Sequence, residues 1–405
     1  MGVIKKPMVI DVLTAARQRI AYAFDHCEAI YISFSGGKDS SVMTHLVMEE
    51  AIKRNRKVGL LLIDLEAQYN LTIEHAKEMY RLYAAHIEPY WCCLPIKLRN
   101  AVSNFEPVWC AWDPDRKDDW VREPPIDFPV ITDFDALDFF QPRMEFEEFI
   151  ELFAVWYSRG RATAAFIGIR SDESLNRFRT IATFEKGTHF GKRYTTEVIP
   201  GVYNFYPIYD WRTEDIWRYH AHFPDKPHNK VYDLMYQAGV PFSQMRLCQP
   251  YGDDQRRGLW LYHLLEPQTW GKVIARVNGA NTGALYVEEH GNVSGYGTVK
   301  LPPGHTWKSF SNLLLATMPA VTREHYLPRL RSWLLGWHKR GYTNGIPDEA
   351  PRELEKKYWA PSWRRVAKVL LRNDWWCKGL GMQQPKSAAY GKYLEMKRQR
   401  KEVSA

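Results

Sequence analysis

The feature that most constrains this chain is the loop Ser-Gly-Gly-Lys-Asp-Ser at positions 35–40, which joins a short apolar strand to an amphipathic helix. Two adjacent glycines allow a tight turn that brings backbone N–H groups close to an anion, and the following helix adds the positive end of its dipole. Lys38 adds a compact positive charge, and the serine hydroxyls can donate hydrogen bonds. Because a single residue separates Gly36 from Lys38, the loop differs from the phosphate loop of kinases and GTPases. We therefore predict a pyrophosphate-binding loop, with a plain strand-to-helix turn as the alternative.

Apolar runs alternate with helical patterns along the first 240 residues. Helices are predicted where apolar residues recur at a spacing near 3.6, and strands where the apolar run is short and continuous. Continuous runs indicate parallel strands that are covered on both faces, so we predict a doubly wound, mostly parallel α/β sheet. The predicted helices are 9–26, 40–54, 72–85 and 145–158, and the predicted strands are 29–34, 57–64, 86–92 and 163–169.

Polar residues follow three of these strands. Ser35, Asp64 and Arg170 each come just after a predicted strand. Ligands of such sheets bind outside the carboxyl ends of the strands, so we expect these side chains to meet in one crevice. Asp64 is a candidate to bind ribose hydroxyls or to help hold Mg²⁺, and Glu66 is a second candidate for the metal. A strand-end cap is the alternative role for both carboxylates.

The loop resembles the S-G-G-x-D-S signature of the N-type ATP pyrophosphatases (PP-loop proteins). Residues 20–240 resemble the phosphoadenosine phosphosulfate (PAPS) reductase family within them. The resemblance implies an adenine nucleotide alpha hydrolase-like fold that binds ATP or a related adenine nucleotide together with Mg²⁺. It implies catalytic roles for Lys38 and Arg170 and metal contacts from Asp39 and Asp64. The nucleotide-binding residues that it implies are Ser33, Phe34, Ser35, Gly36, Gly37, Lys38, Asp39, Ser40, Ser41, Asp64, Gly168, Arg170 and Glu173.

Residues 168–174 are similar to the family segment G-x-R-x-x-E-S, in which the arginine faces the anionic end of the substrate. A planar guanidinium suits sulfate or phosphate because it can donate two parallel hydrogen bonds. Glu173 either orients Arg170 or begins a helix. Arg177 and Arg179 either extend the positive surface or are solvated residues on that helix.

Two predictions concern helix caps. Ser171 and Asp172 are typical capping residues, and Thr213 is predicted to cap a helix that follows it. Thr213 lies within 207–217, which resembles the family segment P-[IL]-x-x-W-x-x-x-D-[IV]-W. This segment supports the fold more than the chemistry.

The pattern changes twice along the chain. Residues 95–143 are rich in Trp, Asp and Pro and are predicted to form an insertion or lid in the nucleotide-binding domain, 1–240. The remainder, 241–405, is predicted to be a smaller, mainly helical domain with a basic tail. Its start, 246–259, resembles a subgroup that contains the immunoglobulin-binding regulator A proteins of enterobacteria, which are often encoded beside a ParB-like protein. The predicted helices here are 309–315, 325–340 and 362–371.

The formal charge of +8 and the pI near 9.0 indicate an anionic partner, which a nucleotide explains in part. Residues 386–401 concentrate this charge and either contact nucleic acid or form a solvated helix. No run of eighteen apolar residues and no secretory signal is present, so we expect a cytoplasmic protein without membrane contact.

The six cysteines are scattered without zinc-like spacing, so reduced thiols are expected. Cys92, Cys93 and Cys110 are the residues from which an iron–sulfur cluster or metal site would be built. Cys248 is either an inert thiol or a nucleophile activated by Arg246.

These observations favour an ATP-dependent adenylyl transfer with release of pyrophosphate to a sulfate-like or nucleic-acid-linked acceptor. The alternative is a nucleotide-binding transcriptional regulator or phage-defence component that acts with a ParB-like partner. A sulfonucleotide reductase ranks third, because the Glu-Cys-Gly-[IL]-His segment of those reductases is missing and their degraded phosphate loop contrasts with the intact loop here.

Overall fold

The computed structural model describes residues 9–183, 186–253, 259–280, 299 and 301–383. These residues divide into two compact units. One unit, here called the PP-loop unit, lies within 1–97 and 110–247, and the C-terminal unit lies within 98–109 and 248–386. The chain therefore leaves the PP-loop unit after Lys97, returns at Cys110 and leaves it again after Leu247.

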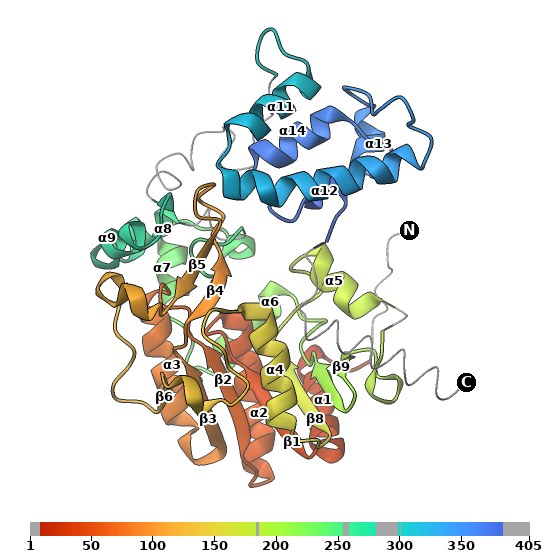
Figure 1. Ribbon diagram of the computed structural model, residues 1–405. Helices are drawn as coiled ribbons and strands as arrows, with labels where there is room; N and C mark the ends of the chain where they lie inside the picture. Colours follow the sequence, from red (N-terminus) through yellow and green to blue (C-terminus); the bar gives the residue numbers. More distant parts are fainter. Residues whose placement is uncertain (1–8, 184–185, 254–258, 281–298, 300, 384–405) are drawn as a thin grey trace. The chain divides into compact units, whose positions relative to one another are not determined.

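A seven-stranded sheet forms the centre of the PP-loop unit, in the order β6-β3-β2-β1-β8-β10-β9 (Figure 1). Neighbouring strands are parallel except β9 and β10, which are antiparallel. The predicted mostly parallel sheet is thereby confirmed. The strands are β1 (Ala29–Ser33), β2 (Val58–Ile63), β3 (Ile87–Cys92), β6 (Val130–Ile131), β8 (Thr163–Ile167), β9 (Thr195–Ile199) and β10 (Val202–Phe205).

Helices cover both faces of this sheet. Successive residues of a strand point to opposite faces, so the contacts of two neighbouring residues in β3 show which helix lies on each face. Tyr90 of β3 packs against Tyr157 of α4, with ring centroids 5.7 Å apart. The next residue, Trp91, packs against Tyr80 of α3 at 5.1 Å. Helices α3 and α4 therefore lie on opposite faces. The helices of the unit are α1 (Val12–His26), α2 (Lys38–Lys53), α3 (Asn70–Leu82), α4 (Phe146–Ser158), α5 (Leu175–Ala182), α6 (Thr213–His222) and α7 (Val231–Gln237).

The strand order reverses direction beside β1. From β1 the chain builds outward through β2 to β3, and then β8 is added on the other side of β1. The two strands end together, since Ser33 pairs with Ile167. A reversal of this kind leaves a crevice at the carboxyl ends of the two strands, which is the position expected for a ligand.

The insertion predicted at 95–143 contains short strands. Strands β4 (Ile96–Arg99), β5 (Val108–Ala111) and β7 (Met144–Glu145) form a separate three-stranded sheet in the order β5-β4-β7. Strands β4 and β5 carry the chain out of the PP-loop unit and back. Strand β6 instead extends the edge of the main sheet beside β3.

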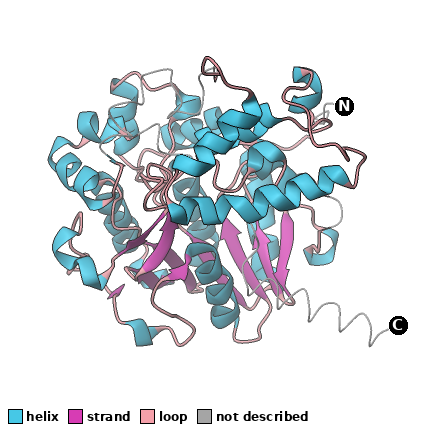
Figure 2. Cartoon of the chain, turned by 45° about the horizontal axis from the view of Figure 1, so that its top comes forward, coloured by secondary structure: helices cyan, strands magenta, loops and turns pink. Residues whose placement is uncertain are grey.

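Every regular element that the structure describes from Trp260 onward is helical (Figure 2). The core of this part is aromatic and includes Tyr326, Trp333 and Trp337 of α12, which pack with Val366 and Val369 of α14. The smaller helical domain expected from the sequence is thus present. Its helices are α8 (Trp260–Leu265), α9 (Pro267–Arg276), α11 (Trp307–Thr317), α12 (Ala320–His338), α13 (Arg352–Lys356) and α14 (Trp363–Leu371).

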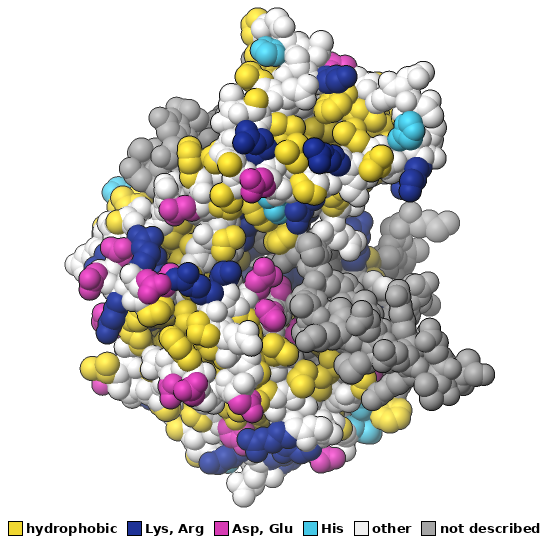
Figure 3. Space-filling model, in the orientation of Figure 1, with side chains coloured by type: hydrophobic (Ala, Val, Ile, Leu, Met, Phe, Trp, Pro, Cys, Tyr) yellow, Lys and Arg dark blue, Asp and Glu magenta, His cyan; other side chains and the backbone are white. Residues whose placement is uncertain are grey.

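The sequence also predicted a protein without membrane contact and a basic C-terminal tail. None of the helices in the described residues has both the length and the apolar composition needed to cross a membrane. On the face drawn in Figure 3, the described basic side chains are interspersed with acidic and hydrophobic ones. The predicted basic tail at 386–401 lies outside the described residues.

Candidate nucleotide-binding site

The loop between β1 and α2 is held in a conformation that needs glycine. Gly36 has φ +72°, and a Cβ at this residue would lie 2.7 Å from the Cγ2 atom of Thr72. The side-chain amide of Asn229 fastens the loop by donating to the Gly36 carbonyl at 2.9 Å and to Thr72 Oγ1 at 3.0 Å. Helix α2 then begins at Lys38, so its N-terminal dipole points at this loop.

Lys38, Asp39 and Arg170 form a buried ion-pair cluster at the start of α2. Lys38 Nζ donates to Asp39 Oδ2 at 2.9 Å and to the carbonyl of Met245 at 3.2 Å. Arg170 Nε donates to the other oxygen, Asp39 Oδ1. The Lys38 and Arg170 side chains are 5% and 3% exposed. The two cations that the sequence selected are therefore brought together, and one carboxylate pairs with both, which leaves one positive charge in excess.

One atom of this cluster lacks a partner. Arg170 Nη1 is buried and has no hydrogen-bond partner among the described residues. A buried donor without an acceptor costs free energy, about 1–3 kcal/mol. An anionic oxygen at this point would recover that cost.

Gly168 explains how Arg170 reaches the loop. A Cβ at Gly168 would lie 3.0 Å from Ser40 Cα and 3.1 Å from Ser40 N. Only glycine lets the end of β8 approach the backbone of α2 this closely. The arginine that follows two residues later is thereby placed beside Asp39.

Glu173 positions the segment after β8. Its carboxylate oxygen Oε2 accepts from the Arg170 backbone N–H at 3.1 Å and from Arg177 Nη1. Its carbonyl accepts from Arg246 at 2.6 Å. Arg177 is thus paired on the helix, which favours the structural alternative for this residue.

The predicted helix caps are wrong by one to three residues. Helix α5 is capped by Ser174, whose hydroxyl accepts from the Arg177 N–H, instead of by Ser171 or Asp172. Helix α6 has Arg212 as its N-cap, and Thr213 is its first helical residue. The Arg212 N–H donates to a carboxylate three residues later at 2.8 Å, and this bond fixes the helix start one residue earlier.

Asp64 is enclosed by donors. Its Oδ2 accepts from the indole of Trp91 at 2.9 Å, and its Oδ1 accepts from the Glu66 N–H at 3.0 Å and from Arg122. The side chain is fully buried. This environment favours the structural alternative, because the carboxylate already receives the hydrogen bonds that a ribose or metal would replace.

Glu66 fastens the returning part of the insertion. Its Oε2 accepts from the Trp112 N–H at 2.7 Å, and its Oε1 accepts from the Val121 N–H at 3.1 Å. Glu66 is buried in a left-handed conformation with φ +62°. The two carboxylates at the end of β2 therefore bind residues 112–122 to the sheet.

The remaining loop residues occupy three environments. Ser35 and Ser40 share a hydrogen bond of 3.0 Å between their hydroxyls. Ser41 is fully buried and lies 2.7 Å from His75 Nε2, which places it behind the loop. Phe34 is buried as well, whereas Ser33 and Gly37 are partly exposed.

Sequence reasoning missed the residues that support the loop from outside it. Besides Asn229, they include Tyr232, whose hydroxyl accepts from the Lys38 N–H at 3.1 Å. His75 is another, and burial lowers the pKa of its ring to about 3. An Asn and a Tyr three residues apart near the end of the domain carry no recognisable sequence signal.

The cysteines do not build a metal site. Among the described residues no group of three or more His, Cys, Asp or Glu side chains is arranged to hold a metal ion. Cys92 and Cys93 are buried, and burial raises the pKa of both thiols. Burial also raises the pKa of the late cysteine Cys377 to about 12, whereas Cys248 is exposed.

The sequence matches two domain families. Residues 29–111 and 132–238 match the phosphoadenosine phosphosulfate reductase domain. Residues 239–360 match a domain of unknown function, DUF3440. The chain is also 41% identical over 398 residues to the uncharacterized protein YbdN of Escherichia coli (strain K12), which covers 98% of this chain and 96% of YbdN. The fold and the loop thus define a protein with a nucleotide-binding fold of the PP-loop type. The chain belongs to the same family as YbdN and carries a PAPS reductase domain followed by DUF3440.

Two solved structures match about half of this chain at low similarity. The phosphate complex of PAPS reductase from Candida auris is 14% identical and covers 54% of this chain and 84% of its own, with a TM-score of 0.31. The FMN adenylyltransferase of Candida glabrata in complex with FAD and inorganic pyrophosphate is 16% identical. It covers 55% of this chain and 59% of its own, with a TM-score of 0.32.

Proposed function

We propose that this protein transfers the adenylyl group of ATP to an acceptor and releases pyrophosphate. The observation that carries the proposal is Arg170, a buried arginine beside an intact loop with one donor lacking a partner among the described residues. The loop, the start of α2 and Lys38 would bind the β- and γ-phosphates. Arg170 would hold an anionic acceptor against the α-phosphate.

The proposed step is a single displacement. An oxygen of the acceptor forms a bond to the α-phosphorus, and the bond from that phosphorus to the bridging oxygen breaks. Pyrophosphate leaves with the electron pair. Arg170 would position the acceptor, and Lys38 would neutralise the charge of the leaving pyrophosphate. These two effects would supply the rate acceleration.

Binding must first redistribute the ion pairs at the loop. In the ligand-free chain Asp39 accepts from both Lys38 and Arg170. A triphosphate carries more charge than a carboxylate and offers more acceptor oxygens, so it can compete for both cations. The side chain of Asp39 would then no longer be paired with Lys38 and Arg170, and it would lie beside the bound phosphates.

The described residues at the loop do not form a magnesium site of their own. Both oxygens of Asp39 are bound to cations, and Asp64 is enclosed by donors. Mg²⁺ commonly binds through substrate phosphates with one or two carboxylates, so we propose that it enters with the nucleotide. The roles of Lys38 and Arg170 do not depend on it. Titration of the protein with ATP in Mg²⁺ or in EDTA measures this requirement.

The test is pyrophosphate release from ATP by the purified chain with sulfate and with DNA as acceptor probes. Lys38→Ala and Arg170→Ala are expected to lower kcat/KM by roughly 10²–10³-fold, as for loss of a preorganised donor. Arg179→Ala removes an exposed arginine of α5 and is the matched control. Equal rates for all three variants would contradict the assigned roles.

A second candidate is a nucleotide-binding regulator without turnover, similar to the immunoglobulin-binding regulator A proteins, that acts in phage defence with a ParB-like partner. The Asp39 cluster favours it, because exchange of two ion pairs on nucleotide binding is a ready signal. ATP binding that Lys38→Ala abolishes, with no pyrophosphate released, would support this candidate over the first. A reductase lacks support, since the late thiol Cys377 is buried and protonated.

A further inference from the structure

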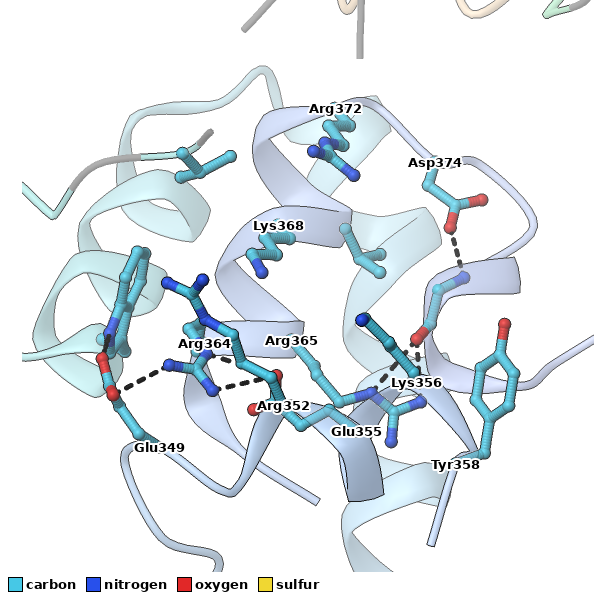
Figure 4. Close-up of a pocket in the computed structure, with 14 residues that line it drawn as sticks. Glu349, Arg352, Glu355, Lys356, Tyr358, Arg364, Arg365, Lys368, Arg372 and Asp374 are labelled. Carbon is cyan, nitrogen blue, oxygen red and sulfur yellow. Dashed lines mark hydrogen bonds and ion pairs between the residues drawn. The ribbon is translucent and has the colours of Figure 1, made fainter. Parts of the chain in front are cut away.

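The C-terminal unit contains a pocket of about 540 Å³ that the proposed function does not use. It lies over α14, with residues of α13 and of the segment after α14 at its walls (Figure 4). This volume falls within the range of small-molecule sites. The side chains around it are mostly charged, and the basic ones are Arg352, Lys356, Arg364, Arg365, Lys368 and Arg372.

Three of these cations line one side of α14. Arg364, Lys368 and Arg372 follow one another at intervals of four residues and form one row in Figure 4. Like charges at this spacing repel each other and destabilise a helix. A row of this kind is therefore unfavourable for folding unless acids or a ligand neutralise it.

Two acids of the pocket pair with Arg364, the first residue of the row. Arg364 pairs with Glu349 at 2.8 Å and with Glu355 at 3.1 Å. The third acid, Asp374, accepts from the backbone N–H groups of Lys378 at 3.1 Å and Gly379 at 2.6 Å. None of these carboxylates forms an ion pair with Lys368, although Glu355 is close enough to oppose the lowering of its pKa.

Two other cations are also engaged. Arg365 donates to the carbonyl of Gly379 at 2.8 Å and to that of Ala360 at 2.9 Å. Lys356 pairs with Glu353 at 3.1 Å. Both have partners within the protein, so neither is the main attraction for a ligand.

Of the three other basic residues, Arg372 also has an interaction partner, which leaves Lys368 and Arg352. Neither makes a hydrogen bond or ion pair with any residue that the structure describes, although both line the pocket. Lys368 is partly buried, and its pKa is lowered by burial and by the nearby charges of Arg364, Arg372 and Arg352, against the opposing effect of Glu355. An anion between these residues would relieve both the repulsion and the missing partners.

We propose that this pocket binds the phosphate of a nucleotide through Lys368 and Arg352. Phosphate is the common biological anion that lysine and arginine recognise together, and its oxygens accept several charge-assisted hydrogen bonds. The pocket is larger than one phosphate, and the half-exposed ring of Tyr358 lies at its wall. The Arg365 guanidinium lies over one face of this ring, 4.8 Å from its centroid, so a base would stack on the other face or on the guanidinium plane. The nucleotide is either free or part of a polynucleotide.

The experiment measures binding of three probes to the full chain carrying Arg170→Ala, which weakens the PP-loop site. The probes are inorganic pyrophosphate, AMP and a fluorescent single-stranded oligonucleotide. Lys368→Gln and Arg352→Gln, each added to this background, are expected to weaken binding of at least one probe by tenfold or more. Lys339→Gln removes an exposed lysine after α12 and is the matched control.

The pattern of binding identifies the source of the phosphate. AMP binding that both variants weaken indicates a free nucleotide, and oligonucleotide binding alone indicates a polynucleotide. Lys368→Gln is also expected to raise the melting temperature of the ligand-free chain by removing repulsion along α14. Arg352 is exposed, so its variant keeps the test valid if the lysine variant misfolds. Binding of all three probes that neither variant changes would overturn the proposal.

Discussion

The loop of the PP-loop unit and the pocket of the C-terminal unit handle positive charge in opposite ways. At the loop a single carboxylate, Asp39, pairs with both Lys38 and Arg170. In the pocket Lys368 and Arg352 have no acidic partner among the described residues. In the first arrangement an anion must compete with the Asp39 carboxylate for Lys38 and for the Nε atom of Arg170. The second attracts anions generally and should be more sensitive to salt.

Removal of the shared carboxylate would make the loop resemble the pocket. Asp39→Asn leaves two buried cations without their counter-charge, so we expect the free energy of unfolding to fall by about 3–5 kcal/mol. Urea unfolding of the ligand-free chain measures this loss. Pyrophosphate should restore part of the stability, because a ligand that binds only the folded chain stabilises it.

The control for this variant is Glu74→Gln, which breaks an exposed ion pair with Lys77. Exposed pairs contribute about 0–1 kcal/mol. A loss for Asp39→Asn no greater than that of the control would show that the buried pairs are not what balances the loop. The contrast between the two sites would then fail.

Mild acid should lower the stability of the PP-loop unit more than that of the C-terminal unit. Burial lowers the pKa of His45 to about 4 and the pKa values of His75 and His220 to about 3, and all three lie in the PP-loop unit. Between about pH 6.5 and these values the unfolded chain binds more protons than the folded chain. Stability is therefore full above about pH 6.5 and falls as the pH falls, by about 1.4 kcal/mol per pH unit for each histidine.

Urea unfolding at about pH 7.0 and about pH 5.5 measures this loss. Burial also lowers the pKa of His189 in this unit, so we expect His75→Gln to reduce the pH dependence by somewhat less than about a third. A substitution of the exposed His222 should leave it unchanged. In the C-terminal unit the pKa of His325 is lowered to about 4 by burial, so one histidine contributes there. An equal acid sensitivity of the two units would contradict this expectation.

A smaller effect is expected at the insertion. Glu66→Gln replaces one acceptor oxygen with an amide donor that faces the N–H groups of Trp112 or Val121. One buried N–H then lacks an acceptor, which costs about 1–3 kcal/mol. Limited proteolysis should cut residues 112–122 faster in this variant. Cleavage that matches the wild type would mean that Glu66 does not hold the insertion.

The fold and the loop could be predicted from the sequence because both are local patterns. Each predicted helix and strand of the sheet through β8 is present, within a few residues. The glycine pair and the strand-to-helix junction lie within a dozen residues of each other. Arg170 was found because a strand end precedes it.

The roles of the strand-end carboxylates could not be predicted in the same way. The partners of Asp64 and Glu66 within the insertion lie 46 to 58 residues away, and nothing in the sequence pairs them. The pocket was missed because the sequence alone does not distinguish Lys368 and Arg352 from ordinary residues on a helix surface. Their lack of ion-pair partners is apparent only from the three-dimensional positions of the surrounding carboxylates.

The close approach of Gly168 to Ser40 couples the two walls of the candidate nucleotide site. A Cβ at Gly168 would lie only 3.0 Å from the Ser40 backbone, so neither β8 nor the start of α2 can shift alone. A substitution that moves Arg170 therefore also moves the loop. For the proposed adenylyl transfer, a change of selectivity on the acceptor side that leaves phosphate binding intact would require this glycine to be kept.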